Sequence, residues 1–180
     1  MKTTTLIRAG LGFLFFALLV PAGLFVAFGG WSWPAAWAYT ALYLLSVLLS
    51  RLLVWRKHPD TLAERSRFAE HSGVSRDRWL AMLTALLLPL ASTILSGLDH
   101  RFGWSVPLPF WLRTLGGVMI ALSFAWATWA MLENRFFSAV ARIQTERGQQ
   151  VVSSGPYRVV RHPAYASSLL AWLGAPLLLN

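Results

Sequence analysis

The feature that most constrains this chain is the spacing of its charged residues. Residues 9–50 form a run of 42 positions without Asp, Glu, Lys or Arg. A membrane-spanning helix needs about 20 apolar residues, so this run is long enough for two helices joined by a turn. The turn is predicted at residues 29–34, where Gly and Pro favour a reversal and Trp31 and Trp33 suit the lipid headgroup layer.

Three further charge-free runs follow: Trp79–Leu98 with 20 residues, Thr114–Leu132 with 19 and Pro163–Leu179 with 17. The composition agrees, because 13% of the residues are charged against roughly 25% in soluble domains. We therefore expect an all-α, multi-pass helical membrane protein with about five transmembrane helices in one domain, residues 1–180. The expected spans are approximately 9–29, 34–54, 79–98, 113–132 and 163–179.

The basic residues predict the orientation of these spans. Fourteen of the 16 Lys and Arg residues precede the first span or lie between spans two and three or four and five, and only Arg101 and Arg113 lie on the other side. The positive-inside rule then places the N-terminus in the cytoplasm, as for a protein of the bacterial inner membrane. Orientation also accounts for the net charge of +9, so the expected partner is the lipid bilayer and not a nucleic acid. No pattern specifies an oligomeric state.

Two polar stretches have simple interpretations. The connection Arg51–Arg78 mixes basic, acidic and apolar residues, and is predicted to lie against anionic headgroups; the alternative is a cap over a substrate portal. The stretch Asp99-His100-Arg101 is predicted to be a solvated turn, because a metal site usually needs three or more protein ligands. The chain has no cysteine, which excludes disulfides and cysteine-ligated metals, and no metal site is expected.

The connection between the fourth and fifth spans, residues 134–162, is predicted to be a cytoplasmic segment that carries chemistry. Gly155-Pro156 favours a turn, and Pro163 suits the first position of the last helix with His162 as its cap. The free N–H groups and partial positive charge of that helix start favour a carboxylate or phosphate.

Side chains around this helix start add to the pattern. Arg158 and Arg161 stand beside it, and the rings of Tyr157 and Tyr165 are suited to hold a sulfonium or ammonium cation. The alternative is that the arginines only set the orientation and Tyr165 anchors the interface.

The sequence VARIQTERGQQVVSS followed by GPYRVVRHPAY resembles the signature of the isoprenylcysteine carboxyl methyltransferase family of integral membrane methyltransferases. The resemblance covers Asn134–Leu173 closely, and membrane phospholipid and thiol methyltransferases have related signatures. It implies S-adenosylmethionine as cofactor at the cytoplasmic face, and a lipophilic acceptor (a carboxylate, a thiol or a lipid) that enters from the bilayer. The residues that it assigns to the cofactor are Gly155, Pro156, Tyr157, Arg161, His162, Pro163 and Tyr165, together with Gln149, where the family usually has His.

The implied reaction needs no metal. Its sulfonium donor is already activated, so methyl transfer requires positioning and exclusion of water, and a base only for a neutral acceptor; no catalytic residue is assigned. The family usually has Gly where this chain has Ser167, and it continues beyond this helix, so the resemblance implies a C-terminally truncated member. Two alternatives are a membrane reductase of sterol-reductase-like architecture and a non-catalytic membrane scaffold.

Overall fold

The computed structural model describes residues 3–61, 79, 82–138 and 143–180, and their side chains from Gly12 onward. These residues form helices and connections without a strand, which confirms the predicted all-helical fold. The elements are α1 (Thr3–Phe28), α2 (Pro34–Lys57), the π-helical turn η1 (Leu83–Leu87), α5 (Leu88–Phe102), α6 (Phe110–Glu133), the short 3₁₀ helices η2 (Thr145–Arg147) and η3 (Gly155–Arg158), and α7 (Pro163–Leu179).

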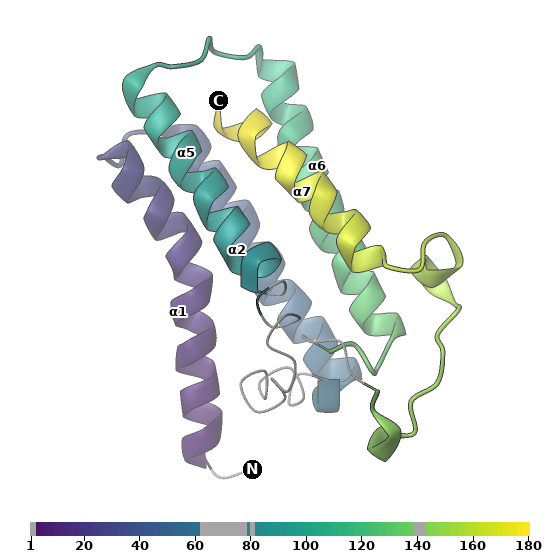
Figure 1. Cartoon of the computed structure of the whole chain (residues 1–180). Helices are drawn as coiled ribbons and strands as arrows, with labels where there is room; N and C mark the ends of the chain where they lie inside the picture. The colour runs from purple at the N-terminus through teal and green to yellow at the C-terminus, as the bar shows by residue number, and fades with distance from the viewer. Residues whose placement is uncertain (1–2, 62–78, 80–81, 139–142) are drawn as a thin grey trace.

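Helix length and composition place the chain in a membrane. Within the described residues, three helices are long and apolar enough to cross a bilayer: Pro34–Lys57, Leu83–Phe102 and Phe110–Glu133. Gly12–Phe28 and Pro163–Leu179 are shorter apolar helices that run alongside them (Figure 1). Large hydrophobic side chains are exposed on all of these helices, as lipid contact requires. The chain is therefore an integral membrane protein.

Proline sets several helix ends. Pro34 and Pro163 occupy the first helical positions of α2 and α7, where a missing N–H leaves no hydrogen bond unmade. His58 precedes Pro59 and ends α2, because a residue before proline disfavours helical geometry. Pro89 follows η1, in which the Leu88 N–H reaches back five residues to the Leu83 carbonyl; the wider turn accommodates a proline that cannot donate.

The third apolar helix extends further than predicted. The stretch Asp99-His100-Arg101 forms the last turn of α5 and is not a loop. Gly103 ends the helix in the left-handed conformation (φ 63°), and its N–H donates to the Asp99 carbonyl at 2.8 Å. The Asp99 carboxylate accepts the Ser105 N–H at 2.9 Å, and the His100 ring stacks on Trp33 with 4.1 Å between centroids. Trp33 is consequently buried within the protein, and does not face the headgroups.

The helices pack in pairs. α6 packs closely against α7, α1 against α5, and α2 against α6, with α2 and α5 between α1 and the α6–α7 pair (Figure 1). Gly116 and Gly174 allow the first pair its close approach, since a Cβ on Gly116 would lie 2.6 Å from the Gly174 carbonyl oxygen. Nearer the start of α7, the Ser123 hydroxyl donates to the Ser167 carbonyl at 2.6 Å. Ser167 therefore fits into this interface, and its hydroxyl donates to the Ala164 carbonyl of its own helix.

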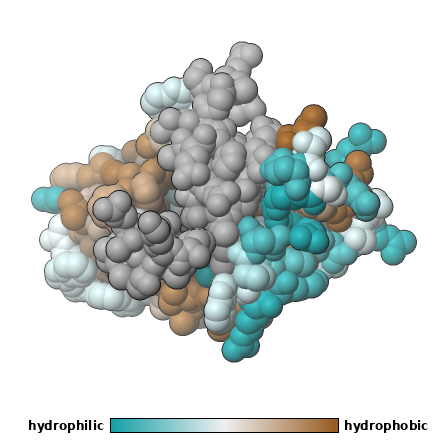
Figure 2. Space-filling view, turned by 90° about the horizontal axis from the view of Figure 1, so that it is seen from below, coloured by the Kyte–Doolittle hydropathy of each residue, from teal (hydrophilic) through white to brown (hydrophobic). Residues whose placement is uncertain are grey.

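The two ends of the bundle differ. The main hydrophobic cluster joins the end of α1 to the start of α2 and the end of α7, through residues such as Leu24, Trp33 and Leu179. The other end, where α2 and α6 finish and α7 begins, is called the basic end here; among the described residues it carries Arg56, Lys57, Arg135, Arg147, Arg158 and Arg161. Seen from that end, hydrophilic residues gather on the side of the α6–α7 connection (Figure 2).

Part of the predicted connections lies outside the described residues. This applies to positions 62–78 of the segment expected to lie against the headgroups, and to positions 139–142 of the α6–α7 connection.

Candidate functional site at the basic end

The start of α7 has the geometry that the sequence predicts. His162 is the N-cap and Pro163 is the first helical residue. The His162 carbonyl accepts the N–H groups of Tyr165 at 3.1 Å and Ala166 at 3.2 Å, so the first turn presents fewer free N–H groups than expected. No side chain caps this end, and within the described part of the chain the Ala164 N–H has no partner.

The side chains at this helix start point outward. Tyr165 is 67% exposed, and its ring lies 5.7 Å from the His162 ring. Arg161 is also exposed, and makes no hydrogen bond or ion pair with the described residues. A guanidinium, an imidazole and an aromatic face are thus available together beside one helix start, as a ligand with both a carboxylate and a cationic centre would require.

The GPYR segment folds against the end of α6. Gly155 has a positive φ of 55°, and a Cβ at this position would lie 2.9 Å from Cγ of Glu133. Pro156 is buried. The Tyr157 hydroxyl receives a hydrogen bond from the Asn134 amide at 3.3 Å and donates to the Ala130 carbonyl at 3.4 Å. Both the backbone and the ring of this segment are therefore fixed by α6.

The environment of Tyr157 keeps its phenol protonated. Burial raises the pKa of Tyr157; the Asn134 hydrogen bond lowers it, and the nearby Glu133 carboxylate raises it again, with a net upward shift. A raised pKa means that the folded protein holds this proton more firmly than the unfolded chain does. The contribution to stability is present below the ordinary tyrosine pKa and is lost as the pH rises through the folded value.

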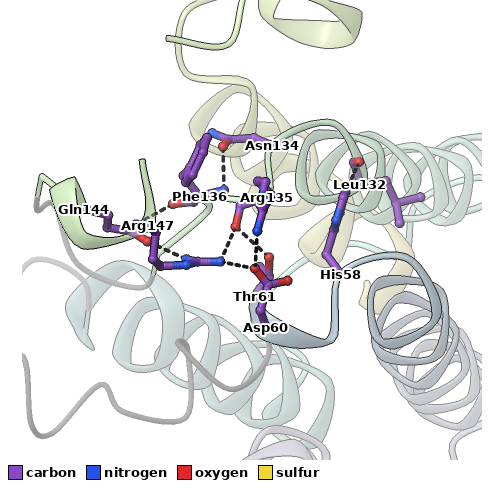
Figure 3. A network of polar contacts seen from close by, with 9 residues as sticks. All are labelled: His58, Asp60, Thr61, Leu132, Asn134, Arg135, Phe136, Gln144 and Arg147. Carbon is purple, nitrogen blue, oxygen red and sulfur yellow. Dashed lines mark hydrogen bonds and ion pairs between the residues drawn. The ribbon is translucent and has the colours of Figure 1, made fainter. Parts of the chain in front are cut away.

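A polar network, shown in Figure 3, joins the end of α2 to the α6–α7 connection. The His58 Nε2–H donates to the Leu132 carbonyl at 2.9 Å, and the Thr61 hydroxyl donates to the Arg135 carbonyl at 2.7 Å. The α2 end thus supplies donors to carbonyls at and just beyond the end of α6, where no intrahelical donor is available.

Asp60 is the acidic centre of this network (Figure 3). Its Oδ2 accepts from Arg147 Nη2 at 2.7 Å and from Arg135 Nη2 at 3.2 Å. Burial raises the pKa of the Asp60 carboxyl, but the hydrogen bonds and charges of the two arginines outweigh this and bring the pKa below its ordinary value. Its ionised form therefore stabilises the fold at neutral pH, and this contribution is lost as the pH falls through the lowered pKa.

The structure brings most of the predicted site residues into two groups. Gly155, Pro156 and Tyr157 lie against the end of α6, and Arg161, His162, Pro163 and Tyr165 surround the start of α7. Gln149 makes no hydrogen bond with either group among the described residues; it lies next to η2, where its Oε1 accepts the Gln144 N–H at 2.6 Å.

Sequence reasoning missed the residues of the Asp60 network. The positive-inside rule had explained Arg135 and Arg147 by orientation alone, and His58, Asp60 and Thr61 follow a helix without any motif. The available signal was a carboxylate on the same predicted membrane side as several arginines, but charge placement does not specify which residues meet.

Comparison with known proteins adds to this geometry. Residues 111–180 match the model of the phospholipid methyltransferase family. The matched region comprises nearly all of α6, the connection with its GPYR segment, and α7. No curated protein and no solved structure matches the chain. The match supports the methyltransferase class that the sequence predicts, through a family related to isoprenylcysteine carboxyl methyltransferase and not through that family itself.

Proposed function

We propose that this chain is a membrane-embedded methyltransferase that uses S-adenosylmethionine and acts on a lipophilic acceptor, a carboxylate, a thiol or a lipid. The observation that carries the proposal is the match of residues 111–180 to the phospholipid methyltransferase family. The proposal is also supported by the geometry, because the matched region contains both the GPYR segment and the RHPAY helix start, at the same end of the α6–α7 pair.

The residues available at the start of α7 fit the chemical groups of this cofactor. Arg161 and the Ala164 N–H suit its carboxylate, while the exposed ring of Tyr165 suits its sulfonium. Gly155, Pro156 and Tyr157 would line the cofactor from the α6 side. Gln149 would offer it the amide NH₂ and the second lone pair of Oε1, since one lone pair of that oxygen already accepts the Gln144 N–H.

The bound cofactor supplies an activated methyl group. The protein then has to hold donor and acceptor in line and keep water out. An acceptor that arrives as a carboxylate or thiolate needs no base, whereas a neutral acceptor does. The exposed faces of the apolar helices would admit a lipophilic acceptor from the bilayer, and the basic end would face the cytoplasm, where the cofactor is dissolved.

Cofactor binding tests the proposal directly. We expect the 180-residue protein, purified in detergent or nanodiscs, to bind S-adenosylhomocysteine in isothermal titration and to transfer a labelled methyl group to a component of a lipid extract. The nicotinamide nucleotides serve as the comparison. If the protein binds NADPH but not S-adenosylhomocysteine, the result would favour the membrane reductase alternative. If it binds neither ligand, the result would favour the non-catalytic scaffold alternative.

A further inference from the structure

We propose that Asp60 is a positioning residue for this reaction: through Arg147 it fixes the α6–α7 connection to the end of α2, and thereby places the segment that would hold the cofactor. The inference rests on the proposed function, because it concerns how that cofactor segment is positioned. It assigns a role to a residue outside the region that matches the methyltransferase family, residues 111–180.

Arg147 connects three parts of the chain at the basic end. Its Nη2 donates to Asp60 Oδ2 at 2.7 Å and to the Arg135 carbonyl at 2.9 Å, and its Nη1 donates to Gln144 Oε1. One guanidinium therefore joins the end of α2, the chain just beyond α6 and its own loop (Figure 3). The Arg147 side chain is 15% exposed, against 57% for Arg135, so Arg147 is the better shielded partner of Asp60.

Gln144 links Arg147 to Gln149 through hydrogen bonds. This side chain is fully buried, and its Nε2 donates to the Phe136 carbonyl at 2.7 Å. Its backbone N–H donates to Gln149 Oε1, and its carbonyl accepts the Gln149 N–H at 3.2 Å. The network that begins at Asp60 thus ends at Gln149, which the family resemblance assigns to the cofactor.

Two anchors hold the stretch from Gln149 to Gly155. The contacts of η3 with α6 fix one end, and the Asp60 network fixes the other. The main hydrophobic cluster lies at the opposite end of the bundle, so apolar packing there does not replace these hydrogen bonds. The Asp60 side chain is 42% exposed, and partly exposed ion pairs contribute little to global stability. Its loss should therefore loosen the connection without unfolding the protein.

The test compares three variants of the 180-residue protein with wild type in nanodiscs. Asp60→Asn removes the negative charge that pairs with Arg135 and Arg147, and Asp60→Glu retains it. Asp99→Asn is the matched control, since it makes the same change at the opposite end, where Asp99 accepts hydrogen bonds from Ser105. The measurements are the affinity for S-adenosylhomocysteine, KM and kcat for methyl transfer, and hydrogen exchange of residues 143–154.

We expect Asp60→Asn to weaken S-adenosylhomocysteine binding and raise the KM for S-adenosylmethionine by up to about 5-fold, because Asp60 acts only through the connection and a partly exposed ion pair contributes little. Hydrogen exchange in residues 143–154 should accelerate, while kcat stays within about 3-fold, because the reacting groups are unchanged. Asp60→Glu should recover most of the affinity, and Asp99→Asn should behave like wild type.

The outcomes separate the inference from the proposed function. The role of Asp60 would be overturned if hydrogen exchange of residues 143–154 were unchanged in Asp60→Asn. It would also be overturned if that exchange were faster while the affinity for S-adenosylhomocysteine was unchanged. A wild-type protein that does not bind S-adenosylhomocysteine would overturn the proposed function instead. If Asp60→Asn cannot be purified, Arg147→Lys provides the second variant. It retains the charge but loses the guanidinium that contacts Asp60 and Gln144 through two different nitrogens. Unchanged hydrogen exchange and unchanged S-adenosylhomocysteine affinity in that variant would equally overturn the role.

Discussion

At the scale of single residues, Gly155 shows how the end of α6 and the GPYR segment constrain each other. Its φ of 55° lies in the left-handed region, which side chains other than glycine adopt at a cost of about 1–2 kcal/mol. The same residue lies against Glu133, so that a Cβ would be 2.9 Å from Cγ of that side chain. Backbone conformation and available space both favour glycine here.

Gly148 allows these two effects to be separated. It has a similar φ of 62°, but a Cβ added there would meet no neighbouring atom within 4 Å. We expect Gly148→Ala to lower the free energy of unfolding by about 1 kcal/mol, and Gly155→Ala by about 1 kcal/mol more, because Glu133 must move. Denaturant titration in detergent measures both. If both variants lost the same free energy of unfolding, the Glu133 side chain would not limit the space available to a side chain at position 155.

The exposed side chains at the start of α7 should contribute unequally to cofactor binding. Arg161→Ala should weaken S-adenosylhomocysteine binding by about 10-fold or more, because it removes a charged hydrogen-bond donor. Tyr165→Ala should weaken it by a smaller factor, about 2- to 5-fold, because a cation–π contact at an exposed site contributes about 0.5–1 kcal/mol. Membrane insertion should not change, since the other basic residues still set the orientation.

Arg56→Ala is the control for this pair, because it removes one charge at the same end of the bundle from the exposed surface of α2. Calorimetric titration provides the affinities. Wild-type affinity in both Arg161→Ala and Tyr165→Ala would mean that the cofactor site lies elsewhere.

At the scale of helices, the crossing of α6 and α7 decides where the site residues lie. A Cβ on Gly116 would be 2.6 Å from the Gly174 carbonyl oxygen and from the Leu178 nitrogen. These are backbone atoms, so only separation of the two helices relieves the overlap. We expect Gly116→Ala to destabilise the protein by about 1–3 kcal/mol, and to weaken cofactor binding because α7 moves relative to η3.

Gly117 is the matched control for this crossing. A Cβ there would be 3.9 Å from the nearest side-chain atom, Cδ1 of Leu178. Gly117→Ala should be neutral or stabilising by up to about 1 kcal/mol, since alanine is the better helix former. Unfolding in a denaturing detergent compares the two variants, and a neutral Gly116→Ala would contradict the close crossing.

The helices were predictable because charge spacing and apolar length are local properties of the sequence. The expected span 163–179 coincides with α7, and the one expected at 79–98 differs from the helix that ends at Phe102. That difference has a local cause: polar Asp99, His100 and Arg101 suggested a loop, whereas the left-handed Gly103 ends the helix after them. A charged last turn is compatible with a helix, because cations are favoured at its C-terminus.

The candidate site was predictable only in part, for a physical reason. His162 and Pro163 form a helix start through their own backbone preferences, so their motif indicated the geometry. The pair formed by Asp60 and Arg147 joins residues 87 positions apart, and depends on how α2 packs against α6. No pattern along one segment encodes that packing, and the two residues therefore looked like ordinary loop charges.

At the scale of the whole molecule, the two ends are stabilised differently. Aromatic and aliphatic side chains pack together at the end opposite the basic end, where Phe28 and His100 both contact Trp33. At the basic end, charged side chains and backbone carbonyls of the α6–α7 connection form the contacts (Figure 3). A region held by hydrogen bonds can adjust to a polar ligand at less cost than a close-packed core, since core packing tolerates little change in volume. The basic end is thus the better suited of the two for binding a cofactor.

The proposed function depends on the orientation of the helix bundle in the membrane. The chain has no cysteine, so single cysteines can be introduced without background. Val151 is 96% exposed in the α6–α7 connection, and Val106 is 83% exposed between α5 and α6; substitution of either by Cys leaves the charge distribution intact. We expect an impermeant maleimide to label Val106→Cys in intact cells, and Val151→Cys only in inverted vesicles, because fourteen of the 16 basic residues would otherwise lie outside. Labelling of Val151→Cys from outside the cell would place the proposed site away from the cytoplasmic cofactor, and would rule out the proposed reaction at this end.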